Sequence, residues 1–77
     1  LEKRAYELIS ELRVKNGEIV LLTTDGAVPV FLGDDEFDRK FVYLREFWKQ
    51  VVLKRGYPSY IDLRYSGSIF AKFDSKN

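Results

Sequence analysis

Apolar and polar residues alternate along several short stretches of the chain, which is the pattern of β-strands with one buried face. The first such stretch covers residues 9–15, where Leu12 and Val14 share a side with Ser10 and charged residues occupy the other side. It follows residues 1–8, whose apolar side chains recur at helical spacing and predict a short helix. A helix this short is marginal alone, so it must pack on another element.

Two glycine-containing dipeptides predict tight turns. Asn-Gly at residues 16–17 and Asp-Gly at residues 25–26 both suit turns that need a positive φ. The stretches that follow them, residues 18–24 and 27–32, are rich in β-branched and apolar side chains and predict two further strands. Pro29 lies inside the third strand and lacks an N–H donor, so that side of the strand must be exposed or bulged.

The clearest helix signal lies in the middle of the chain. Its apolar residues recur every three or four positions and form one face that can cover a sheet. They are Phe37, Phe41, Leu44, Trp48, Val51 and Val52. Asp34 or Asp35 is the expected N-cap. Gly56 is the expected residue after the last turn, and Pro58 prevents the helix from continuing.

The charged residues of this helix suit a structural role. The acidic residues of the first turn complement the helix dipole, and they lack the glycine and the terminal bidentate glutamate of a calcium loop, so no metal site is expected. The basic residues predict a solvated face, with a contact to a partner or to lipid headgroups as the alternative. They are Arg39, Lys40, Arg45 and Lys49.

The C-terminal stretch predicts another hairpin. Residues 60–65 and 68–73 alternate in polarity around a Ser-Gly turn at residues 66–67. In the returning strand Phe70 and Lys72 share one side, and the residues beside them share the other. The predicted order is therefore α-β-β-β-α-β-β. This is an α+β fold, with a mainly antiparallel sheet and one long amphipathic helix on one face.

Length and composition limit the classes of protein to which the chain can belong. A chain of 77 residues is at most one domain, with an expected folded core at about residues 8–73. Hydrophobic residues make up 45% of the chain, which is enough for a globular fold. The chain contains no Met and begins at Leu1, so we expect a piece of a longer protein.

The charge balance and the missing residue types argue against nucleic-acid binding and catalysis. The net charge is +1, without the positive excess of a nucleic-acid binder. The chain has no His and no Cys, which removes the commonest proton shuttle, thiol nucleophiles and the usual zinc ligands. The remaining Asp, Glu, Lys and Tyr residues form no recognisable catalytic motif. We therefore expect a non-enzymatic domain without a cofactor.

Several segments in a fixed order resemble the β-domain of the FtsQ/DivIB cell-division proteins. Residues 9–12 resemble the family's "iSEi" strand, residues 21–26 its "dG" turn, and residues 28–33 the "V.lG" strand that leads into a long helix. The most specific match is residues 60–69, which resemble the family's "(y/v)iDLRy" strand and the short turn after it. The resemblance covers about residues 8–73, the C-terminal part of the β-domain.

The resemblance implies a scaffold role in the bacterial divisome. FtsQ/DivIB proteins catalyse nothing and hold other division proteins, chiefly the FtsB/FtsL pair (DivIC/FtsL in Gram-positive bacteria). They are anchored in the inner membrane by one helix, and a POTRA domain precedes the β-domain. The implied location is therefore the extracytoplasmic, periplasmic side of the inner membrane at the division septum, with the anchor and the POTRA domain in a part of the parent protein absent here.

The resemblance also implies where the partner binds. In the family, the partner contributes a strand beside the last strands of the β-domain. The position of the last strand supports this mode, because a final strand is often a sheet edge. The free N–H and C=O groups of such an edge can pair with another chain. The predicted partner-binding residues are Arg64, Tyr65, Ser66, Gly67, Ser68, Ile69, Phe70, Ala71, Lys72 and Phe73.

The residues leave three alternatives open. Asp62 and Arg64 either form a recognition pair or, more often for such residues, make a structural salt bridge or cap a loop. A POTRA-like envelope or secretion domain unrelated to division would show a similar order of elements. An exposed last strand would also permit self-pairing into a homodimer.

Overall fold

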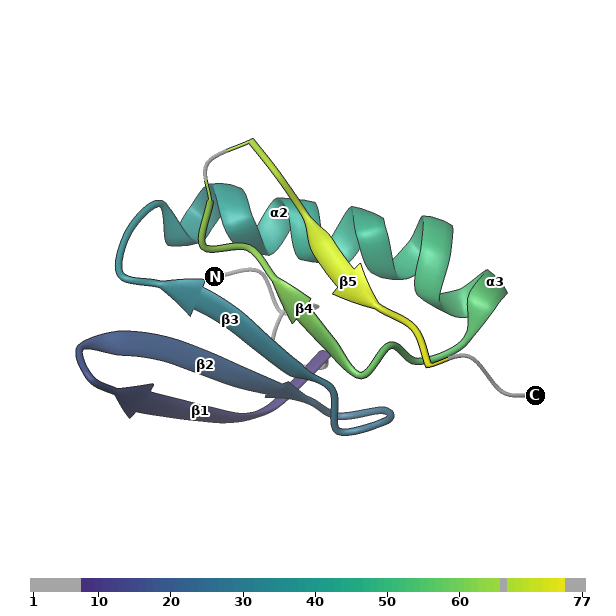
Figure 1. Ribbon diagram of the computed structural model, residues 1–77, viewed down its shortest axis with the longest axis horizontal. Coiled ribbons are helices and arrows are strands. Elements are labelled where there is room, and N and C mark those ends of the chain that lie inside the picture. Colours follow the sequence, from purple (N-terminus) through teal and green to yellow (C-terminus); the bar gives the residue numbers. More distant parts are fainter. Residues whose placement is uncertain (1–7, 66, 75–77) are drawn as a thin grey trace.

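The first three strands follow one another through short turns, and the last two strands follow a long helix (Figure 1). The computed structural model describes residues 8–65 and 67–74. Its strands are β1 (Ile9–Lys15), β2 (Glu18–Thr23), β3 (Pro29–Gly33), β4 (Tyr60–Asp62) and β5 (Phe70–Lys72). The helical segment consists of α2 (Phe37–Phe47), η1 (Trp48–Val52) and α3 (Leu53–Arg55). The helix predicted for residues 1–8 lies outside the described residues, apart from Leu8.

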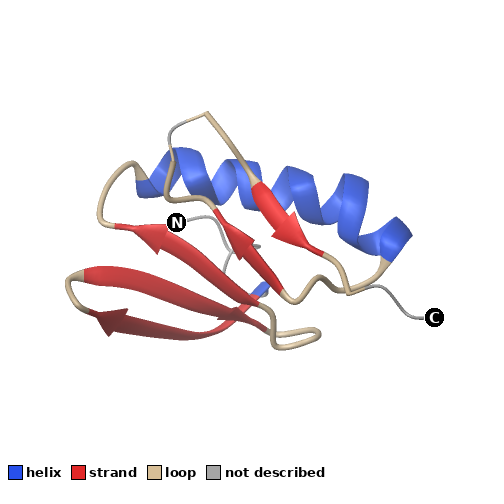
Figure 2. Ribbon diagram, in the orientation of Figure 1, coloured by secondary structure: helices blue, strands red, loops and turns tan. Residues whose placement is uncertain are grey.

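The strands form a sheet in the order β1-β2-β3-β4-β5. Strands β3 and β4 are parallel, and the other neighbouring pairs are antiparallel. The parallel pair arises because the helix carries the chain from the end of β3 back to the start of β4. The helical layer covers one face of the sheet (Figure 2). The predicted α+β fold with a mainly antiparallel sheet is confirmed.

The two turns between the first three strands differ in length. Asn16 and Gly17 have φ values of 52° and 77°, and Lys15 pairs with Glu18 directly beside them, so the predicted two-residue hairpin is confirmed. The second turn is longer than the predicted Asp-Gly turn and spans residues 24–27. Strand β3 consequently starts at Pro29 instead of Ala27, and a strand's first position tolerates proline.

Side chains hold this second turn in place. The hydroxyl of Thr23 donates a hydrogen bond to Asp25 O (2.7 Å) and accepts one from the backbone N–H of Val28 (2.9 Å). Gly26 has a φ of 78°, and a Cβ atom at this position would lie 2.6 Å from Cγ of Tyr57. Glycine is therefore required at residue 26 both for its backbone conformation and for the approach of the tyrosine ring.

The helix begins differently from the sequence prediction. The residue before the first turn is Glu36, with a φ of 51° and no side-chain hydrogen bond that caps the described helix, so the N-cap predicted at Asp34 or Asp35 is wrong. Asp35 accepts a hydrogen bond from Lys40 Nζ (2.9 Å) instead. The predicted C-terminal glycine is confirmed, because Gly56 has a φ of 95° and donates a hydrogen bond to Val52 O (2.8 Å).

Lys40 corrects the prediction of a fully solvated basic face. Its side chain lies within the structure, at 4% relative exposure, and its ammonium donates hydrogen bonds to Leu32 O (2.5 Å) and to Asp35. Leu32 lies near the end of β3, and Asp35 lies in the connection between β3 and α2. Arg39 and Lys49 are exposed as predicted. The buried lysine thus ties the start of the helix to the end of β3.

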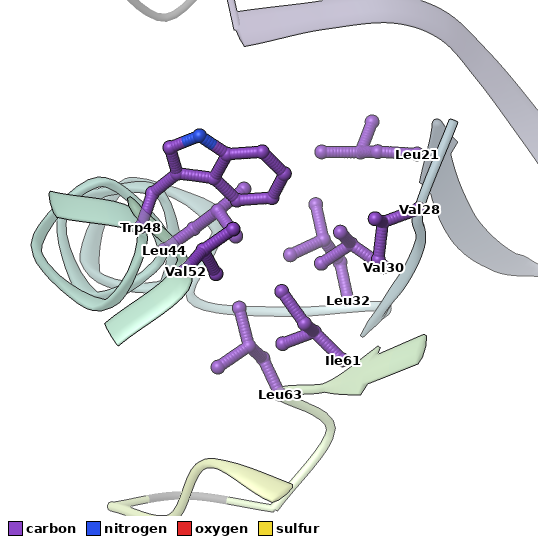
Figure 3. Close-up of a cluster of buried hydrophobic side chains, with 9 residues drawn as sticks. All are labelled: Leu21, Val28, Val30, Leu32, Leu44, Trp48, Val52, Ile61 and Leu63. Carbon is purple, nitrogen blue, oxygen red and sulfur yellow. The ribbon is translucent and has the colours of Figure 1, made fainter. Parts of the chain in front are cut away.

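The core lies between the helical layer and the central strands (Figure 3). The buried apolar residues of the described chain are Leu21, Val28, Val30, Leu32, Leu44, Trp48, Val52, Ile61 and Leu63. Of the predicted helix face, Leu44, Trp48 and Val52 are buried, whereas Phe37 and Phe41 are only partly buried against the core. The apolar face of the helix is therefore most deeply buried between Leu44 and Val52.

Strand β1 departs most from the prediction of one buried face. Leu12 pairs with Leu21 and Val14 with Ile19, yet Leu12 is 56% exposed and Val14 is 69% exposed. Leu12 borders a hollow of about 210 Å³, lined also by residues of β2, β3 and α2. The apolar side of β1 is therefore not covered by the described residues, because the helix lies over the strands nearer the centre of the sheet.

Replacing a buried leucine of the helix should destabilise the domain. Leu44 has no exposed surface, so Leu44→Ala should lower the free energy of unfolding by about 2–5 kcal/mol. Leu53→Ala makes the same chemical change at a position that is 70% exposed, and should cost less than about 0.5 kcal/mol. Urea denaturation followed by circular dichroism measures both values. Equal losses would contradict the packing of α2 on the sheet.

Candidate partner-binding edge

Strand β5 forms one edge of the sheet (Figure 1). It pairs with β4 through Tyr60 and Lys72, Ile61 and Ala71, and Asp62 and Phe70. No strand in residues 8–65 and 67–74 pairs with its other side. The backbone groups on that side are therefore available to an added strand.

Both C-terminal strands are shorter than predicted. Strand β4 ends at Asp62 instead of Tyr65, and β5 contains residues 70–72 instead of 68–73. Strand β3 ends at Gly33, and directly after β4 the backbone N–H of Leu63 donates a hydrogen bond to Phe31 O of β3 (2.9 Å). The residues after Leu63 therefore have no partner in β3 with which to continue the parallel pairing.

The predicted partner-binding residues therefore lie on two kinds of structure. Phe70, Ala71 and Lys72 form β5. Arg64, Tyr65, Gly67, Ser68, Ile69 and Phe73 lie beside the two strands, and Ser66 lies outside the described residues. Ile69 and Ala71 pack against the core, whereas Phe70 and Lys72 are exposed. The side chains that a partner can reach alternate along β5, as an added strand requires.

Aromatic rings gather on the sheet face opposite the helix. Tyr65 is 60% exposed and meets Phe70 edge to face, with ring centroids 6.2 Å apart. Phe31 and Tyr60 form a similar pair at 6.0 Å. Sequence reasoning missed Phe31 as part of this surface. The alternation of residues 27–32 places it opposite the buried Val30 and Leu32, which is the signal that would have found it.

Arg64 lies between these two aromatic pairs. Its guanidinium carbon is 5.3 Å from the centroid of Phe31 and 5.9 Å from that of Tyr65, both within the range of cation–π attraction. Arginine and tyrosine are common anchors of protein interfaces. The described surface thus combines an open strand, exposed rings and a cation.

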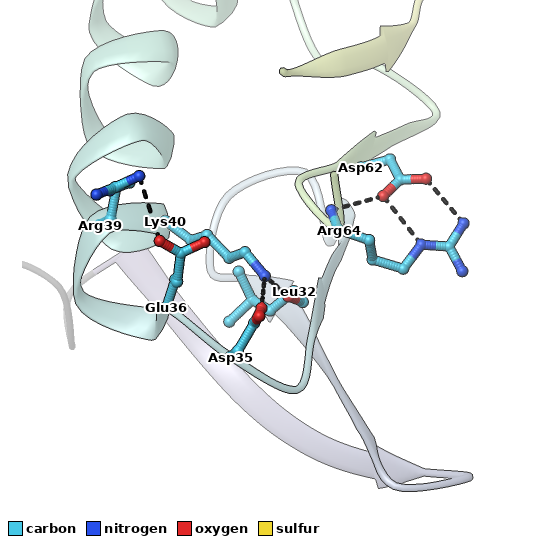
Figure 4. A network of polar contacts seen from close by, with 7 residues as sticks. All are labelled: Leu32, Asp35, Glu36, Arg39, Lys40, Asp62 and Arg64. Atoms are coloured by element: carbon cyan, nitrogen blue, oxygen red, sulfur yellow. Dashed lines mark hydrogen bonds and ion pairs between the residues drawn. The ribbon is translucent and has the colours of Figure 1, made fainter. Parts of the chain in front are cut away.

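Asp62 holds this arginine through both carboxylate oxygens (Figure 4). Oδ1 accepts hydrogen bonds from the backbone N–H and from Nε of Arg64, each 3.0 Å long, and Oδ2 accepts one from Nη2 (2.8 Å). The hydrogen bonds from Arg64 hold the pKa of the Asp62 carboxyl below its usual range, and burial opposes this shift. The same contact raises the pKa of Arg64 further, so both groups are charged at neutral pH.

The described residues provide no evident metal site. They contain no group of three or more His, Cys, Asp or Glu side chains that could hold a metal ion. Of the acidic residues before and in the first helical turn, Asp35 pairs with Lys40, and Glu36 pairs with Arg39 at 3.2 Å. Within the same part of the chain, no helix is long and apolar enough to span a bilayer.

The fold and this surface define a small α+β domain with an accessible sheet edge. The family model for the C-terminal domain of the cell-division protein FtsQ/DivIB matches residues 1–64. The chain is also 40% identical over 79 residues to a cell division protein FtsQ of Rhodothermus marinus (strain ATCC 43812 / DSM 4252 / R-10). That match covers 94% of this chain and 29% of the relative. The chain belongs to the FtsQ/DivIB family of cell-division proteins.

The pH dependence of the free energy of unfolding should reveal the contact between Asp62 and Arg64. Asp62→Asn should lower the free energy of unfolding by about 1 kcal/mol at neutral pH, a modest value because Arg64 is 39% exposed. A carboxyl with a depressed pKa stabilises the fold above its unfolded-state pKa, near 3.8, and loses this contribution as the pH falls through the lower folded-state value.

The difference between wild type and Asp62→Asn should therefore be constant between about pH 5 and pH 7 and shrink below about pH 4. Urea denaturation at a series of pH values measures it. A difference that grows on acidification would contradict the assigned contact.

Proposed function

We propose that this domain is a non-catalytic interaction module of a divisome scaffold, and that it binds an FtsB/FtsL-type (DivIC/FtsL-type) partner by strand addition at β5. The observation that carries the proposal is the position of β5: it is an edge strand in the described sheet, and Phe70 and Lys72 project from its exposed side. Backbone pairing would supply much of the affinity, and alternate side chains the specificity.

The residues beside β5 fit the same mode. Tyr65 extends the exposed aromatic surface from Phe70, and Arg64 places a charge at the point where an added strand would pass the end of β4. Gly67 has a φ of 75° and shapes the turn into β5. These residues belong to the set that the family resemblance assigns to the partner.

Membership of the FtsQ/DivIB family favours this function over that of an envelope or secretion domain unrelated to division. The chain spans 29% of the relative's length, so it corresponds to one part of a longer parent protein. We infer that the parent is anchored in the inner membrane and presents this domain on the extracytoplasmic side at the division septum.

Charge introduced at the aromatic edge should remove partner binding without unfolding the domain. Tyr65→Glu and Phe70→Glu place a carboxylate at positions that are 60% and 54% exposed, so the fold should persist while Kd for the purified extracytoplasmic FtsB/FtsL pair rises at least about tenfold. Isothermal titration calorimetry measures the affinity, and circular dichroism checks the fold.

Val14→Glu is the matched control, because it places the same charge on an apolar residue that is 69% exposed in β1, at the opposite edge of the sheet from β5. It should bind like the wild type. An equal loss of affinity in this control, or unfolding of the two edge variants, would count against strand addition at β5. Association of the wild-type chain with itself alone would instead support the homodimer.

A further inference from the structure

We propose that Asp62 is a positioning residue for partner binding: it fixes the guanidinium of Arg64 over the aromatic surface before the partner arrives. This inference rests on the proposed function and deepens it. Asp62 has 7% relative exposure, so a partner meets Arg64 and not the carboxylate behind it.

The geometry restrains several torsions of the arginine side chain. The contact is bidentate, through Nε and Nη2, and the backbone N–H of the same residue binds the same carboxylate. A planar guanidinium held at two nitrogen atoms keeps one orientation, which a single hydrogen bond would not impose. Asp62 itself is anchored in β4, where it pairs with both Phe31 of β3 and Phe70 of β5.

Gly33, at the end of β3, lies beside this arrangement. A Cβ atom at residue 33 would lie 3.5 Å from Cγ of Arg64 and 3.5 Å from Nζ of Lys40. The two cationic side chains therefore converge on the glycine at the end of β3. Lys40 adds a smaller effect to that of Arg64: it also favours the charged form of Asp62 and lowers its pKa.

The held arginine keeps hydrogen-bonding capacity for a partner. An arginine has five side-chain N–H groups, and the contact with Asp62 uses two of them. Nη1 lies 3.9 Å from Glu18 Oε1, an ion-pair distance that is too long for a hydrogen bond. Because the side chain is ordered before binding, the association avoids the entropy cost of immobilising it.

The first experiment needs no partner. Nuclear magnetic resonance of the ¹⁵Nε–¹H group of Arg64 should show a slowly exchanging, motionally restricted signal in the wild type. In Asp62→Asn, which cannot accept at both atoms, that signal should exchange and move faster. Circular dichroism confirms that the variant is folded. An equally restricted Nε–H group in a folded Asp62→Asn variant would overturn the proposal.

The second experiment is a double-mutant cycle with the purified extracytoplasmic FtsB/FtsL pair as the probe. Asp62→Asn should raise Kd about two- to tenfold in the wild-type background, which is the range expected for immobilising one long side chain. The same change should have no effect in an Arg64→Ala background, because Asp62 acts through that arginine. An effect that persists without Arg64 would assign Asp62 a direct or merely structural role.

The two proposals fail in different ways. If the wild type binds the probe and Asp62→Asn binds it equally well, only the positioning role is wrong. If the wild type does not bind the probe, the proposed function fails and takes the positioning role in binding with it, while the resonance of Arg64 still reports whether Asp62 orders the side chain.

Discussion

The packing of one helical layer on β3 and β4 is the constraint on which the rest of the structure depends. Leu44, Trp48 and Val52 are buried in one cluster with Ile61 of β4 and with Leu63, which directly follows that strand. Because the chain passes through this helix between β3 and β4, the two strands run parallel and side by side. Strand β5 then pairs with the free side of β4, which makes it one of the two edges of the described sheet. Burial of apolar surface in the core thus decides where the proposed site lies.

Features set by neighbouring residues could be predicted from the sequence. The Asn-Gly turn at residues 16–17 needs only its own backbone preferences, and it forms as expected. The central helix and its terminal Gly56 likewise follow from local periodicity and local backbone conformation. The strand order was not predicted, because it depends on the crossover through the helix.

Features set by distant residues could not be predicted. The residues around Lys40 in the sequence are those of a solvent-exposed helix face. Its side chain is buried because its ammonium donates a hydrogen bond to Leu32 O, which lies close to it only in the folded chain. Leu12 and Val14 alternate like buried strand residues, and they are exposed because the helix does not reach β1. A periodic pattern shows which side of an element is apolar, but it does not show whether another element covers that side.

The candidate site shows the same division. The carboxyl-terminal edge was predicted from the family resemblance and from the position of the last strand. Tyr65 and Phe70 of the aromatic surface were among the predicted residues. The pairing of Phe31 with Tyr60 was not predicted, because these two residues are far apart in the sequence and meet through the parallel register of β3 and β4. The Asp62 and Arg64 contact lies between these outcomes: the pair was noted, and the choice between a structural and a recognition role was left open.

The shortness of β5 has a consequence for solubility. An open edge strand can pair with strands of other chains and start aggregation. Long, flat and hydrophobic edge strands aggregate most readily. Strand β5 has three residues and ends in an exposed lysine, so it offers few consecutive backbone groups to an arbitrary chain. A ligand with matching side chains for the nearby rings gains contacts that a random strand lacks. The edge at β5 can therefore stay open with little tendency to start aggregation.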